Sequence, residues 1–120
     1  MTIIATMRRA LLLCLACIGP AVLAGCSTAR VDERMAYWKI ETDAHLKVGT
    51  TRGQAEEFFA ARNATLKCCT RQRPGPDQYF VHERKVGHAL WTEYDVAVLV
   101  EFSPAGEVSA VRIERWGVGF

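Results

Sequence analysis

The sequence has no long apolar run after its first 25 residues, few cysteines beyond that segment and no excess charge of either sign there. Thirteen of the fifteen Lys and Arg residues follow Gly25, as do all thirteen Asp and Glu residues, so the charges of this part balance. Nucleic-acid binding needs concentrated Lys and Arg, and we therefore expect no nucleic-acid partner. The sequence also lacks a nucleophile elbow, a Gly-rich phosphate loop and internal repeats. We expect neither an enzyme nor a bound cofactor.

The one apolar run lies at the N-terminus. Arg8 and Arg9 precede the apolar segment Ala10–Ala24, which is the order of regions in a secretory signal. The segment is too short, and too interrupted by Gly and Pro, to span a bilayer. Because Leu23-Ala24-Gly25 stands directly before Cys26, the segment resembles a bacterial lipoprotein signal. This resemblance implies cleavage before Cys26 and acylation of that residue.

With this cleavage site, the predicted chain has three parts. We expect residues 1–25 to be the cleaved signal, 26–30 to be a short lipidated tether and 31–120 to form one small domain. Met7 is an equally good start of the signal. By resemblance to Gram-negative lipoproteins, Ser27 in place of Asp favours the outer membrane, with the domain facing the periplasm.

Besides Cys26, which we expect to be acylated, the mature chain has only two cysteines, Cys68 and Cys69, and they are adjacent. An oxidising periplasm favours disulfides, but neighbouring Cα atoms across a trans peptide lie about 3.8 Å apart, closer than in a relaxed bridge. We expect two reduced thiols buried on a strand, with a vicinal disulfide, an intermolecular bond or a bound metal as alternatives. The alternative function is therefore redox chemistry or metal handling. Histidines that could join a metal site are His45, His82 and His88.

Two helices are predicted before the sequence pattern changes from helical spacing to the alternation typical of strands. Val31–Leu46 has no Gly or Pro and repeats apolar residues at spacings of three and four. Thr51 and Gln54 form a capping-box pattern that opens a second helix, Arg52–Arg62. Asn63 is a candidate left-handed residue after it. The side chains expected to face the core from the second helix are those of Phe58 and Phe59.

Strand patterns follow. Thr65–Thr70 and Gln78–Glu83 are short β-permissive segments on either side of a Pro-Gly-Pro loop, and Leu90–Phe102 alternates with period two. We expect Glu93 and Asp95 to lie on the solvated face of this last strand. Ser103–Gly106 is a tight turn, after which Glu107–Trp116 returns antiparallel. We predict an α+β fold, with two N-terminal helices packed on a three- or four-stranded antiparallel sheet.

This order of elements resembles the small outer-membrane lipoproteins of the BamE type over roughly residues 40–115. The resemblance rests on Val48-Gly49-Thr50-Thr51 at the start of the second helix and on the hairpin Val100–Val108. Thr50 stands where the family has Met, and Ala60–Asn63 stands where the family ends the helix with Leu-Gly-x-Pro. The same unit also resembles β-lactamase-inhibitor-like domains. Both resemblances imply the fold and a tendency to bind proteins.

Aromatic residues near the C-terminus are the candidates for a partner surface. Trp91 lies on the less apolar side of its predicted strand, while Trp116 and Phe120 lie in the C-terminal segment. Exposed aromatic residues often mark protein interfaces, although packing against the first helix is the alternative. The sequence predicts an envelope lipoprotein whose periplasm-facing domain is a protein-binding or scaffold module, in outer-membrane assembly or maintenance.

Overall fold

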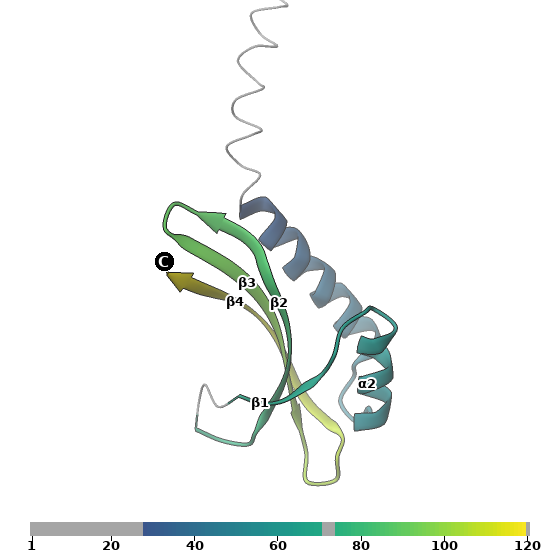
Figure 1. Cartoon of the computed structure of the whole chain (residues 1–120). Coiled ribbons are helices and arrows are strands. Elements are labelled where there is room, and N and C mark those ends of the chain that lie inside the picture. Colours follow the sequence, from purple (N-terminus) through teal and green to yellow (C-terminus); the bar gives the residue numbers. More distant parts are fainter. Residues whose placement is uncertain (1–27, 71–73, 120) are drawn as a thin grey trace, which may run out of the picture.

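The computed structural model describes residues 28–70 and 74–119, and it has an α+β architecture. Two helices precede a curled antiparallel sheet of four strands in the order β1-β2-β3-β4 (Figure 1). The predicted fold class is confirmed, and the sheet has four strands rather than three. The elements are a first helix over residues 28–45, α2 Arg52–Ala60, β1 Lys67–Thr70, β2 Gln78–Ala89, β3 Thr92–Phe102 and β4 Val108–Gly119.

The described part of the first helix includes residues 28–30, which the sequence analysis assigned to the tether. Residues 28–30 include neither Gly nor Pro, and nothing in their composition stops a helix there. Cys26 lies outside the described residues.

The start of α2 is the capping box that the sequence predicted. The backbone N–H of Gln54 donates to Thr51 Oγ1 at 3.2 Å, and the Thr51 N–H donates to Gln54 Oε1 at 3.1 Å. The helix ends at Ala60, two residues before the predicted end, and Asn63 then takes a φ of 57°. The left-handed residue was predicted correctly because Asn tolerates this conformation better than most residues do.

Both helices bury their apolar sides against one face of the sheet. The ring centroids of Trp38 and Phe59 lie 5.7 Å apart, and both side chains are buried. Phe58 packs edge-on against Phe59 and is also buried, so the predicted core role of both rings is confirmed. The residues of β3 that complete this core are Val96, Val98 and Val100.

A polar contact joins the first helix to β2 beside this core. Arg34 donates to Glu83 twice, from Nε at 3.0 Å and from Nη2 at 2.6 Å, and Trp38 Nε1 donates to the same carboxylate. The hydrogen bond from Arg34 to Glu83 and the negative charge of Glu83 raise the pKa of Arg34 above its ordinary value. This pair fixes the helix on the sheet near the helix N-terminal end.

At the opposite end of the molecule, backbone hydrogen bonds join the helical part to the sheet. The Gly49 N–H donates to the Val108 carbonyl at 2.9 Å, and the Val108 N–H donates to the Thr50 carbonyl at 2.7 Å. These bonds tie the link between the helices to the start of β4. The predicted turn Ser103–Gly106 is present there, with Gly106 at a φ of 78° that favours glycine.

The β2–β3 hairpin differs from the prediction. Strand β2 runs on to Ala89, which pairs with Thr92. Leu90 and Trp91 therefore form a two-residue turn and not the start of the next strand. The irregular register between Glu83 and Gly87 hides the continuity of β2 in the sequence, because a bulge breaks the period of two.

Candidate functional site

The outer edge of β4 is one of the two edges of the sheet. Strand β4 is the last in the sheet order, and no other strand in the described part of the chain pairs with its outer edge. A cavity of about 370 Å³ lies between this edge and the first helix. Its lining residues are Lys39, Thr42 and Asp43 of the helix and Val111, Arg112, Ile113 and Glu114 of β4. We call this cavity with the adjoining strand edge the β4 groove.

The β4 groove combines apolar walls with charges of both signs. Val111 and Ile113 are half-buried and pack against the core. Lys39 forms an exposed ion pair with Asp43 at 3.2 Å. Arg112 Nη1 lies 3.5 Å from Glu114, while Arg112 Nη2 is buried with no hydrogen-bond partner in the described residues. Arg112 and Glu114 alternate along β4 with Val111 and Ile113, so their side chains lie on the other face of the strand, where Glu114 accepts from Trp116.

An unpaired strand edge beside an apolar groove is chemically suited to an extended peptide. Backbone N–H and C=O groups of the edge can pair with a peptide, and alternate side chains of that peptide can enter the groove. Charged side chains on an edge strand, here Arg112 and Glu114, discourage uncontrolled pairing. The arrangement therefore allows selective strand addition.

The sheet face turned away from the helices carries a second polar cluster. His82 Nε2 lies 2.7 Å from Asp95 Oδ2, and the Lys85 backbone N–H donates to Asp95 Oδ1 at 2.8 Å. Asp95 is buried, so the expectation that it lies on a solvated strand face is wrong. The bulge in β2 turns the Lys85 amide toward β3, and the sequence pattern carries no sign of this contact.

Trp116 completes that face. Its ring centroid lies 5.0 Å from that of His82 and 6.3 Å from that of Phe80. Its indole N–H donates to Glu114 Oε2 at 3.1 Å. The side chain is half-buried and does not pack against the first helix, because its register partner Asp95 points to the opposite face from Val96. Trp116 thus contributes mainly to the sheet face, with a partly exposed ring.

Trp91 is 78% exposed at the tip of the β2–β3 hairpin, and Leu90 beside it is 92% exposed. The alternative in which Trp91 packs against the first helix is wrong. Leu90 has a φ of 48°, a conformation that costs a residue with a side chain about 1–2 kcal/mol relative to the right-handed region. Phe120, the third candidate, lies outside the described residues.

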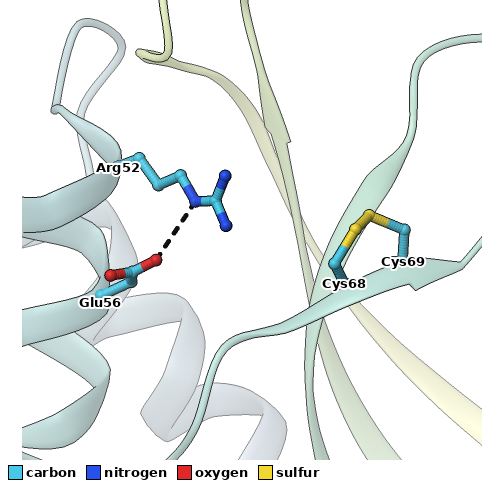
Figure 2. Close-up of a disulfide and its surroundings, with 4 residues drawn as sticks. All are labelled: Arg52, Glu56, Cys68 and Cys69. Atoms are coloured by element: carbon cyan, nitrogen blue, oxygen red, sulfur yellow. Dashed lines mark hydrogen bonds and ion pairs between the residues drawn. A yellow bond between two sulfur atoms is a disulfide. The ribbon is translucent and has the colours of Figure 1, made fainter.

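Cys68 and Cys69 form a disulfide on β1 (Figure 2). Their Cα atoms lie 3.1 Å apart across a cis peptide bond. Cys68 is exposed and Cys69 half-buried, so the prediction of two buried thiols is wrong. The strand β1 is short and lies at the sheet edge, where side chains remain accessible.

The histidines do not gather around the cysteines. His45 lies near Phe58 on the helical side, His82 contacts Asp95, and His88 is exposed on β2. Across residues 28–70 and 74–119, no group of three His, Cys, Asp or Glu side chains is placed to hold a metal ion. Within the same ranges, neither helix has the length and apolar character needed to cross a bilayer.

Comparison with known proteins adds no relative, since the chain matches no protein-family model, no curated protein and no solved structure.

The β4 groove and the His82–Asp95 pair were absent from the sequence prediction. Alternation of Gln78, Phe80 and His82 marks one face of β2, which is the signal that points to the second cluster. The groove depends on which strand is left at the edge, and no residue pattern specifies that.

Proposed function

We propose that this chain is an envelope lipoprotein, anchored through acylated Cys26 in the outer membrane, whose periplasm-facing domain binds an extended segment of an envelope protein. Its role lies in outer-membrane assembly or maintenance, as the resemblance to lipoproteins of the BamE type suggests. The observation that carries the binding proposal is the free edge of β4 beside the cavity. The lipoprotein proposal rests on Leu23-Ala24-Gly25 before Cys26.

Strand addition at the β4 groove satisfies several groups at once. A peptide paired with β4 covers the exposed backbone of the edge, and its apolar side chains contact Val111 and Ile113. Backbone pairing makes the binding tolerant of peptide sequence, while the cavity and the charges of Lys39 and Asp43 select among segments.

Photo-crosslinking in intact cells tests the binding site. A photoreactive residue is placed at Lys39, which lines the groove, and in a matched strain at Ile40, whose side chain is 68% exposed but does not line it. Adjacent helical residues point about 100° apart, so the two probes sample different surfaces of one helix. We expect a discrete crosslinked envelope protein from position 39 and none from position 40. Equal products from both positions would contradict the assignment of the groove.

Acylation is tested separately. In Cys26→Ser, incorporation of labelled fatty acid should be abolished, and the protein should be released or remain uncleaved. The wild-type chain labelled in parallel is the positive control. If the variant still takes up lipid, Cys26 is not the anchor.

The exposed disulfide supports a second candidate function, redox chemistry at Cys68 and Cys69. An accessible disulfide can exchange with an incoming thiolate. Alkylation followed by intact-mass measurement, before and after a reductant, reports whether the pair is bridged. The redox candidate further requires that reduction change partner crosslinking in the wild type and not in the Cys68→Ala, Cys69→Ala double variant. An unchanged crosslink would leave the disulfide with a structural role only.

A further inference from the structure

We propose that Leu90 and Trp91, the hairpin tip, enter the interface of the same bilayer that holds Cys26, and so fix the orientation of the domain on the membrane. This inference rests on the proposed lipid anchor. The hairpin tip is thus a second membrane contact, made by side chains rather than by lipid.

The packing of the described domain does not bury these two side chains. Both project into solvent, at 92% for Leu90 and 78% for Trp91, and Val118 near them is 48% exposed. Leu90 occupies a positive-φ position at which a two-residue hairpin turn usually has Gly. A large apolar pair at a turn that would accept small or polar residues indicates a contact outside the domain.

The hairpin tip lies at the end of the molecule where the first helix begins. At that end, Asp32 in the first turns of the helix pairs with Arg115 of β4 at 3.2 Å. Arg115 is in register with Val96, and β3 runs back from there to Thr92 beside the tip. The other end of the helix leads to Gly49, which is bonded to Val108 at the far end of β4. Figure 1 shows the β2–β3 hairpin beside the start of the first helix.

The length of chain before the helix brings this end close to the membrane. The described helix begins at residue 28, two positions after Cys26. Two residues span at most about 7 Å when fully extended. An acylated Cys26 therefore holds the helix start, and with it the hairpin tip, near the headgroup region.

The chemistry of the tip fits a lipid surface better than a protein. Trp prefers the membrane interface, where its ring is in apolar surroundings and its N–H reaches water. Two large side chains bury roughly 400 Å² at most, about half of what each partner buries in a stable protein interface. The hairpin that carries the tip has charges of both signs, with Glu93 in register with His88 near the tip and Lys85 at the bulge. The contact is therefore hydrophobic, and we expect it to be insensitive to salt.

Tryptophan quenching in vesicles tests the proposal. The full chain, purified from membranes, is reconstituted in neutral phosphatidylcholine vesicles with or without brominated acyl chains, which quench indoles at the interface. The chain has three Trp residues, of which Trp38 is buried in the core and Trp116 half-buried on the sheet. We expect brominated lipid to quench the wild type by a larger fraction than Trp91→Phe, because that variant keeps an apolar ring and lacks the reporter.

A matched reporter is placed at the opposite end. In the Trp91→Phe background, Val48→Trp puts an indole at a position where Val48 is 79% exposed, next to Gly49. We expect no added quenching there. Equal quenching of the wild type and Trp91→Phe would overturn the proposal, as would a Val48→Trp reporter quenched as strongly as Trp91. The intact mass of the same preparation shows whether Cys26 carries lipid, so a failed anchor is recognised independently of a failed tip contact.

Discussion

Replacing Glu83 should weaken the domain more than any replacement of an exposed carboxylate on its surface. Glu83 accepts two hydrogen bonds from Arg34 and one from Trp38, and so joins the first helix to β2. Trp38 is 1% exposed, and in Glu83→Ala its buried N–H is left without this acceptor. A buried unsatisfied donor costs about 1–3 kcal/mol.

The ion pair itself adds a smaller amount. The side chains of Arg34 and Glu83 are 31% and 25% exposed, so solvent screens part of their attraction. Together with the Trp38 donor, we expect Glu83→Ala to lower the free energy of unfolding by roughly 2–4 kcal/mol. For a domain of this size, that corresponds to a fall in melting temperature of roughly 10–25 °C. Glu83→Gln keeps an acceptor for Trp38 and should cost about 1 kcal/mol.

The direction in which the pKa of Arg34 is shifted determines how the stabilising effect of Arg34 depends on pH. The pKa of Arg34 is raised in the folded state. The contribution of Arg34 to the free energy of unfolding is therefore complete below the ordinary pKa of Arg and is lost only as pH rises through the raised value. We therefore expect no loss of this contribution as pH rises through neutrality.

Circular-dichroism melting of the full chain in mild detergent measures these changes. Asp43→Asn is the matched control, because Asp43 also pairs with a basic side chain but both partners are about two-thirds exposed. An exposed i,i+4 pair contributes only about 0.3–0.5 kcal/mol. If Glu83→Ala melted at the same temperature as Asp43→Asn, the assignment of Glu83 as the link between helix and sheet would be refuted.

Three further substitutions test other parts of the fold by the same melting assay. Phe59→Ala removes a fully buried ring and should cost about 3–5 kcal/mol, and unchanged melting would mean that α2 is not packed on the sheet as described. Thr51→Ala breaks the capping box with Gln54 and should cost about 1 kcal/mol, while Thr51→Ser should cost less because it keeps the hydroxyl acceptor. Asp95→Ala leaves His82 without its carboxylate partner and should cost at least about 1 kcal/mol, and a stabilising effect would show that the pair is strained.

Local patterns in the sequence were sufficient for several parts of this protein. The capping box at Thr51 and the turn Ser103–Gly106 depend on residues within four positions of each other, and both were predicted correctly. The buried ring of Phe59 followed from helical spacing in the same way. Short-range chemistry decides such features, since the interacting groups are neighbours along the chain.

Other features depend on contacts between distant segments, and only the tertiary structure decided them. The length of β2 was underestimated because the bulge after Glu83 interrupts its alternation, and this error also placed Trp91 in a strand rather than in a turn. Asp95 was expected in solvent and is buried, because the amide that satisfies it comes from a bulge ten residues away. The β4 groove exists because β4 has no neighbour on its outer side in the described sheet, and strand order is a property of the whole fold.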